Sequence, residues 1–129
     1  MALAILVPFL VSVAWSPTRS TPGPLLPNFP GKSWVATDPV QCMSNPWEID
    51  WLRDHNWNYT TYPHGPEGEA SVVIAYYGKL GVVVYDVKSL ATHNGVCAAC
   101  SCARGDTLYL LVSNRNVGRM LDMGYHPAP

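Results

Sequence analysis

The stretch DTLYLLVSNRNVGRMLDMGY, residues 106–125, predicts a β-strand followed directly by an α-helix. Apolar side chains in its first half alternate between the two faces of the strand. One face carries Leu108, Leu110 and Val112, and the other carries Tyr109 and Leu111. A strand that is apolar on both faces is normally buried on both, so we expect other elements to cover it from two sides.

The helix that follows this strand has recognisable start and stop signals. Ser113 or Asn114 is suited to cap its N-terminus, and Gly124 suits the position just past its C-terminus. Tyr125 is expected to pack back against the helix, and residues 126–129 are expected to form a frayed tail. The apolar stripe of the helix consists of Val117, Met120 and Leu121.

Another helix is predicted upstream, where Asn45 is a favourable N-cap and Pro46 fits the first helical position. Glu48 can reach back to the cap, as in a capping box. Tryptophans follow at Trp47, Trp51 and Trp57. We interpret these side chains as anchors of the core, with a docking face as the alternative.

The stretch between these elements is ambiguous. We favour a helix from about residue 67 to residue 79, with a β-hairpin turning at residues 78–81 as the alternative. Residues 82–87 are predicted to be a strand in either case. The result is a small single α+β domain, residues 41–125, with helices packed on a short sheet and a long Cys-rich loop at residues 88–105.

Composition narrows the class of protein. The chain has 129 residues, of which 48% are hydrophobic, so one domain with a real core is expected. Charged residues make up only 13%, and the formal net charge is -1. A surface with so few charges favours contact with a membrane or with a permanent protein partner. The eight Lys and Arg residues are scattered, so no basic stripe is available to neutralise the phosphates of a nucleic acid.

The N-terminal part of the chain has two unusual segments. Residues 1–15 carry no charged side chain and would span roughly 22 Å as a helix, less than a bilayer core. We interpret them as an apolar N-terminal anchor or signal-like segment, with Ser12 and Ala14 at a candidate cleavage site and a core helix as the alternative. Residues 16–40 are rich in proline and are expected to form an extended arm.

The four cysteines, Cys42, Cys97, Cys100 and Cys102, are interpreted as two disulfides. An even number of cysteines after an export-like start is typical of a disulfide framework. Cys42 must then pair with a cysteine of the loop. A bond between Cys100 and Cys102 would be the most strained, so we expect Cys97 to form the local bond.

Two other uses of these cysteines stay open. All four could hold a structural zinc ion, because Cys97-x-x-Cys100 is a good half-site, although Cys42 is distant from it. The same pair has the spacing of a thiol-disulfide active site, but no helix start follows it. Haem attachment is excluded, because Ser101 stands where that motif requires histidine.

Other motifs are weaker. Asn58-Tyr59-Thr60 matches the N-glycosylation pattern. Arg104-Gly105-Asp106 spells an integrin-recognition tripeptide, which we interpret as a turn into the following strand. Asp50 and Asp54 are assigned to the solvated face of their helix. The histidines, His55, His64, His93 and His126, have no metal-ligand spacing. No nucleophile elbow or phosphate loop is present in the sequence, so we do not expect an enzyme.

We therefore expect a non-catalytic accessory or structural subunit of a larger membrane protein complex, for example an energy-converting one. Its location would be extracytoplasmic, in a periplasm or a lumen, and membrane-associated. Expected partners are integral membrane protein subunits, with membrane lipid near the N-terminus and no nucleic acid, cofactor or small-molecule substrate. Alternatives are a structural zinc-binding module that uses all four cysteines and a thiol-disulfide oxidoreductase using Cys97 and Cys100. The partner-binding candidates are Phe9, Trp15, Pro24, Pro27, Phe29 and Trp34.

Overall fold

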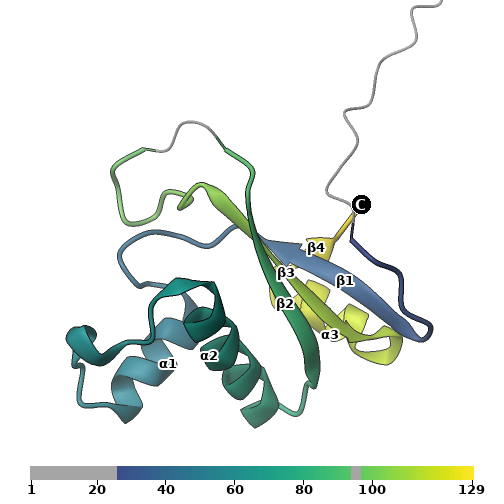
Figure 1. Cartoon of the computed structure of the whole chain (residues 1–129), viewed down its shortest axis with the longest axis horizontal. Coiled ribbons are helices and arrows are strands. Elements are labelled where there is room, and N and C mark those ends of the chain that lie inside the picture. Colours follow the sequence, from purple (N-terminus) through teal and green to yellow (C-terminus); the bar gives the residue numbers. More distant parts are fainter. Residues whose placement is uncertain (1–25, 94–96) are drawn as a thin grey trace, which may run out of the picture.

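The computed structural model describes residues 26–93 and 97–129 and shows helices packed on an antiparallel sheet (Figure 1). The predicted α+β class is confirmed. The strands are β1 (Lys32–Thr37), β2 (Val84–Ala91), β3 (Asp106–Ser113) and β4 (His126–Pro127), in the order β2-β3-β1-β4. The helices are α1 (Pro46–Asp54), α2 (Gly65–Lys79) and α3 (Val117–Asp122), with short 3-10 turns η1 (Tyr59–Thr61) and η2 (Asn114–Asn116).

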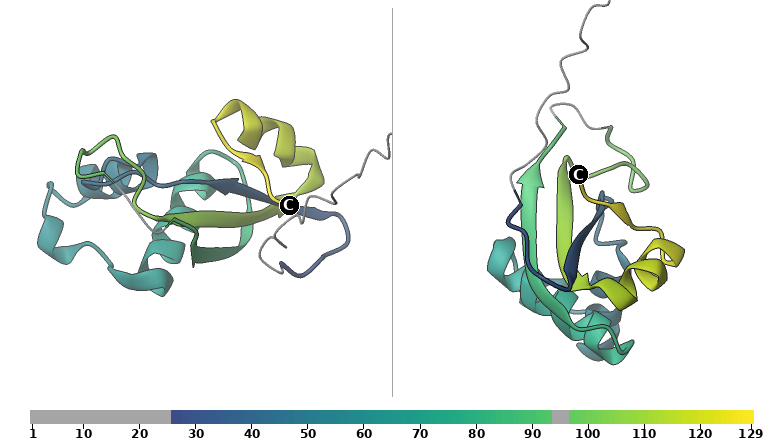
Figure 2. Two further views of the ribbon diagram at one scale, coloured as in Figure 1. Left: turned by 90° about the horizontal axis from the view of Figure 1, so that it is seen from above. Right: turned by 90° about the vertical axis from the view of Figure 1, so that its right-hand side faces the viewer.

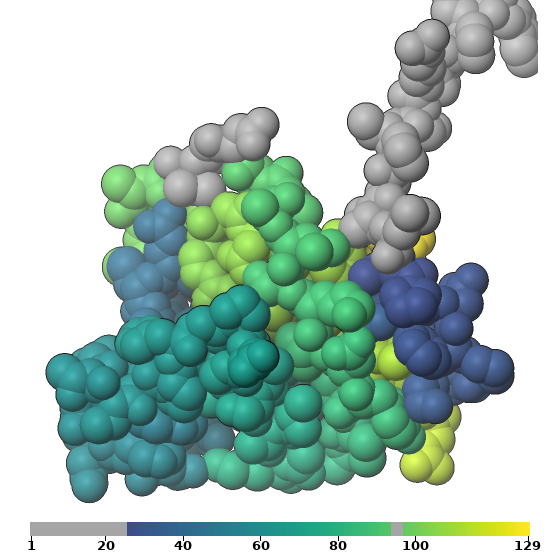
Figure 3. All heavy atoms as spheres, in the orientation of Figure 1, coloured from purple at the N-terminus to yellow at the C-terminus, as the bar shows by residue number. Residues whose placement is uncertain are grey.

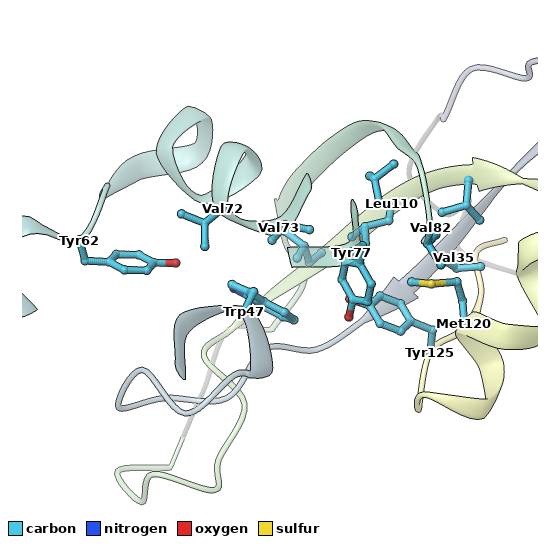
Figure 4. Close-up of a cluster of buried hydrophobic side chains, with 13 residues drawn as sticks. Val35, Trp47, Tyr62, Val72, Val73, Tyr77, Val82, Leu110, Met120 and Tyr125 are labelled. Carbon is cyan, nitrogen blue, oxygen red and sulfur yellow. The ribbon is translucent and has the colours of Figure 1, made fainter. Parts of the chain in front are cut away.

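Strand β3 lies inside the sheet, hydrogen-bonded to β2 on one side and to β1 on the other. Its six central residues are buried, so the prediction that both of its faces are covered is confirmed. One face belongs to the main core, in which the three helices pack against the sheet (Figure 4). That core includes Val35, Trp47, Val73, Tyr77, Leu110, Val112, Met120 and Tyr125.

The other face of the sheet carries no helix. Its buried residues are Trp34, Ala36, Tyr109 and Leu111. Leu26, Leu90 and Ala128 pack against this smaller cluster, so chain segments at both ends of the domain provide part of its cover. Figure 2 shows residues 26–31 and α3 on opposite sides of the sheet. We call this side the helix-free face.

The expected extended arm, residues 16–40, is wrong for its C-terminal part. Lys32–Thr37 form β1, an interior strand paired with both β3 and β4. The prolines are concentrated before and after this segment, which itself contains none, so every β1 residue has a backbone N–H for pairing. The folded domain therefore begins before residue 41, and residues 1–25 lie outside the described residues.

The C-terminal tail was also predicted wrongly. His126 and Pro127 form β4, which pairs with Ala36 and Val35 of β1. Ala128 N donates to Trp34 O over 3.1 Å, so the chain end continues along the sheet edge. A two-residue strand with a proline is typical of an edge position and gives almost no signal in the sequence.

The predicted helix over residues 67–79 is confirmed as α2, which begins two residues earlier at Gly65. The strand placed at residues 82–87 is shifted, because β2 runs from Val84 to Ala91 with an irregularity after Val84. Leu121 was assigned to the buried stripe of the last helix, but its side chain is 38% exposed. The other two residues of that predicted stripe do pack on the main core, since Met120 is buried and Val117 is partly buried against it.

Two glycines of α2 provide a matched stability test. A Cβ at Gly68 would lie 2.6 Å from the backbone O of Pro63, whereas a Cβ at Gly78 would have no atom within 4 Å. We expect Gly68→Ala to lower the free energy of unfolding by about 1–3 kcal/mol because of overpacking. Gly78→Ala should raise it by about 0.5–1 kcal/mol through helix propensity. Urea unfolding of both variants measures the difference, and effects of the same sign would contradict this account.

Candidate functional site

The most elaborate polar arrangement in the described structure surrounds the guanidinium of Arg104. Its Nη1 and Nη2 donate to Oε1 and Oε2 of Glu69 over 2.8 and 2.9 Å. Nε and Nη2 donate to Oδ1 and Oδ2 of Asp106 over 2.9 and 2.8 Å. Nη1 also reaches Oε1 of Glu48 at 3.4 Å. We call Arg104, Glu48, Glu69 and Asp106 the Arg104 cluster.

The Arg104 cluster joins parts of the chain that are distant in sequence. Glu48 comes from α1, Glu69 from α2 and Asp106 from the start of β3, whereas Arg104 lies in the loop before β3. Arg104 N donates to Pro39 O over 2.8 Å, which ties the same loop to the segment before α1. The cluster therefore fastens α1, α2 and the Cys-rich loop to the N-terminal end of the interior strand β3.

The carboxylates of the cluster differ in their electrostatics. Burial raises the pKa of Glu48, and hydrogen bonds from Asn45 oppose this effect only in part. Oε2 of Glu48 accepts from N and Nδ2 of Asn45 over 3.0 and 2.8 Å, which bears out the predicted reach of Glu48 back to the cap. The Arg104 guanidinium holds the pKa of Asp106 below its ordinary value.

A cleft of about 320 Å³ opens beside the Arg104 cluster. Its walls come from the loop before α2, from β2 and from the cluster itself, with Tyr62, His64, Glu69, Ser89, Arg104 and Asp106 among the lining residues. Ser89 Oγ donates to Oδ2 of Asp106 over 2.7 Å. The five N–H donors of Arg104 are directed at carboxylates of the cluster, which suits a structural fastening rather than anion capture.

The hydroxyl of Tyr62 is buried and has no hydrogen-bond partner among the described residues. Figure 4 shows it pointing toward Trp47 and Val72. Burial and the nearby carboxylates of Glu48 and Glu69 raise the pKa of this phenol. The hydroxyl is therefore neutral at ordinary pH. In the described structure no hydrogen bond offsets the cost of burying it.

We expect Tyr62→Phe to leave the free energy of unfolding unchanged or raise it by up to about 1 kcal/mol, because the variant removes an unpaired polar group. Tyr77→Phe is the matched control, since the hydroxyls of Tyr77 and Tyr125 lie 2.7 Å apart in the core. Its loss leaves Tyr125 unpaired and should cost about 1–3 kcal/mol. Thermal unfolding distinguishes the two, and a larger loss in Tyr62→Phe would be contrary to this account.

The four cysteines form two disulfides, Cys42–Cys100 and Cys97–Cys102, with Cα atoms 5.1 and 5.7 Å apart. The prediction of two disulfides, with Cys97 in the local one, is confirmed. Backbone pairing supports the longer bond, because Gln41 N donates to Cys102 O over 3.0 Å. Val40 and Ala103 form a β-bridge beside it. The described residues 97–105 we call the disulfide loop.

The alternative uses of the cysteines do not agree with this pairing. A sulfur in a disulfide is not the thiolate that zinc requires, and within residues 26–93 and 97–129 no group of His, Cys, Asp or Glu side chains is arranged to hold a metal ion. The proposed redox pair of Cys97 and Cys100 is wrong, because each is bonded to a different cysteine. The interpretation of Arg104-Gly105-Asp106 as a turn into a strand agrees with the structure, in which β3 begins at Asp106 and the two charged side chains bind each other.

The partner-binding candidates fall into three groups. Phe9, Trp15 and Pro24 lie outside the described residues. Pro27 and Phe29 are exposed. Trp34 is only 8% exposed and its Nε1 donates to Pro27 O over 2.8 Å, so little of its side chain is open to a partner. Trp34 lies in the interior strand β1, and its side chain belongs to the small core of the helix-free face.

Sequence reasoning missed the Arg104 cluster. It noted Glu48 as a capping residue and Arg104 as part of a turn, without any connection between them. Glu69 is 35 residues from Arg104 in the chain, and no short motif joins the two. The one available signal was that charged residues are scarce, so that an acid beside buried apolar positions needs a partner.

The fold and the site define a small α+β domain, stapled by two disulfides, in which a partly buried ion-pair cluster fastens a loop to two helices. Comparisons of the chain with protein-family models, curated proteins and solved structures find no match. In the part of the chain that the structure describes, no helix has the length and apolar character needed to cross a membrane.

Proposed function

We propose that this protein is a non-catalytic, extracytoplasmic accessory subunit that docks onto a larger membrane complex through its helix-free face. Two disulfides favour an oxidising compartment outside the cytoplasm. The uncharged residues 1–15 are the expected attachment to the membrane or to its integral proteins.

The observation that carries this proposal is a groove of about 320 Å³ between the first described residues and the chain end, which borders the helix-free face and has Val117 of α3 in its wall. Its lining includes Leu26, Phe29, Lys32, Trp34, Val117 and Pro127. Phe29 is 40% exposed at this groove, and Tyr85 is exposed nearby with Lys32 Nζ 4.6 Å from its ring centre. Figure 3 shows the first described residues, in dark blue, beside β2 in green.

The position of this groove suggests its occupant. Leu26, the first described residue, lies in its wall, and the apolar residues 1–15 precede it in the sequence. If these residues hold the chain at a membrane, the groove lies on the part of the domain nearest the tether in sequence. We therefore propose an apolar segment of an integral membrane subunit as the occupant. Exposed aromatic side chains at the edge of a small groove are typical anchors of such an interface.

Copurification of the full chain from native membranes in gentle detergent tests the proposal. Phe29→Ser should reduce recovery of the partner subunits at least about tenfold, because it removes an aromatic anchor. Ile74→Ser is the matched control, since Ile74 is similarly exposed at 41% but lies on α2, which contributes no residue to the groove. Recovery of the wild-type chain only as a free monomer would contradict the proposal, and so would equal losses in the two variants.

A further inference from the structure

We propose that Asn58 is an N-glycosylation site, accepting an oligosaccharide from a lipid-linked pyrophosphate donor in a secretory lumen. Asn58 is the only asparagine of the 129-residue sequence that is followed by any residue except proline and then by Ser or Thr. A tripeptide match alone is weak. The structure adds that the tripeptide is exposed on the folded domain and that its side chains adopt a defined local conformation.

The side chain of Asn58 is held in an Asx-type turn by Thr60. Thr60 N and Thr60 Oγ1 both donate to Oδ1 of Asn58, over 3.2 and 2.7 Å. These bonds fix the side-chain amide by its oxygen. Among the described residues, Nδ2 of Asn58 has no hydrogen-bond partner, so the reacting nitrogen is available without breaking a bond.

The turn also presents Asn58 at the surface. Asn56 and Trp57 have positive φ values of 54 and 57°, which reverse the chain after α1. Asn58, Tyr59 and Thr60 are all exposed. Trp57 and Tyr59 are 51% and 53% exposed on either side of Asn58. A glycan here would cover two large aromatic side chains that the folded domain leaves open to water.

The location of the turn leaves the rest of the domain unobstructed. Figure 1 shows the connection between α1 and α2 at the end of the molecule opposite the C-terminus and residue 26. The groove that includes Phe29 is at that other end. A glycan on Asn58 and a partner at the groove would therefore not compete for the same surface.

The chemistry at Asn58 is a group transfer. A bond forms between Nδ2 of Asn58 and C1 of the first sugar, and the bond between C1 and the pyrophosphate oxygen breaks. The pyrophosphate leaves with the electron pair, and one Nδ2 proton passes to a base of the transferring enzyme. The donor is a lipid pyrophosphate oligosaccharide, and no oxidant or reductant is needed. The two disulfides of the domain are compatible with the oxidising lumen in which such transfer occurs.

Expression of the full chain in a eukaryotic secretory host tests the inference. Intact mass and peptide mass spectrometry, before and after treatment with peptide N-glycosidase, should show a glycan on Asn58 and its conversion to aspartate on release. Asn58→Gln and Thr60→Ala should abolish the glycan, whereas Thr60→Ser should retain it. Thr61→Ala is the matched control, because it removes the neighbouring hydroxyl and leaves the acceptor tripeptide intact.

Wild-type protein with unmodified Asn58, whether secreted or retained, overturns the inference. Loss of the glycan in Thr61→Ala to the same extent as in Thr60→Ala also overturns it, because the effect would then be one of folding. The result is separate from the docking proposal. A glycosylated chain that recovers no membrane partner would support this site and remove the proposed function.

Discussion

Replacing Cys42 and Cys100 together by alanine is expected to lower the free energy of unfolding by about 4 kcal/mol. The bond joins residues 58 apart in the sequence, so its removal frees a long loop of the unfolded chain. It also removes the covalent link between the disulfide loop and the segment before α1, which are otherwise joined by backbone hydrogen bonds. In a domain of this size a loss of that magnitude is a large part of the total stability.

The local disulfide provides the matched comparison. Cys97 and Cys102 are only 5 residues apart, so their double alanine variant should lose about 2 kcal/mol by the same entropy argument. Guanidinium unfolding of both double variants under non-reducing conditions gives the two values. Equal losses would show that strain or contacts of the loop, rather than loop length, decide the contribution of each bond.

Arg104→Met is the second variant with a large expected effect, a loss of about 3–5 kcal/mol at neutral pH. The side chains of Glu48, Glu69 and Asp106 are only 4, 11 and 19% exposed. Without the guanidinium, these carboxylates would lie close together and poorly solvated, with no cation among them. Methionine keeps much of the side-chain volume, so the loss reports charge and hydrogen bonding rather than a cavity.

The loss of unfolding free energy caused by Arg104→Met should become smaller as the pH falls. In the wild type, the lowered pKa of Asp106 gives stability that is present above its unfolded pKa and is lost as the pH falls through the folded value. The raised pKa of Glu48 has the opposite sign, because protonation then favours the folded state. Removing Arg104 should raise the pKa values of Glu48 and Asp106, which the guanidinium lowers, so the variant gains relative stability between neutral pH and about pH 4. A difference that is constant over this range would refute the account.

Two controls separate the geometry of the cluster from its charge. Arg104→Lys keeps one positive charge but loses the paired donors. We therefore expect its free energy of unfolding to lie between those of the wild type and Arg104→Met. Arg53→Gln removes a guanidinium that is 63% exposed and 3.7 Å from Asp50, and it should cost no more than about 1 kcal/mol. Unfolding measured in the same buffer compares all three variants.

Local features of this chain were predictable from its sequence. The Asn45-Pro46 start and the reach of Glu48 back to the cap depend on residues within one helical turn, and the structure shows both. The alternation along residues 108–112 predicted a strand covered on two faces. The positions of Cys42, Cys97, Cys100 and Cys102 predicted two disulfides, because strain over a short separation excludes one local pairing.

Non-local pairing was decided only by the tertiary structure. β1 follows a proline-rich stretch and β4 has only two residues, so the sequence of neither segment predicts a strand. Each is stabilised by hydrogen bonds to a strand that is distant in the sequence. The meeting of Arg104 with Glu48 and Glu69 depends on how α1 and α2 pack against β3, and no local spacing encodes it. The sequence thus determined the elements that depend on neighbouring residues and the pairing of its cysteines in two disulfides. The fold decided which charges are buried together, because long-range contacts form only when the whole sheet and its helices are assembled.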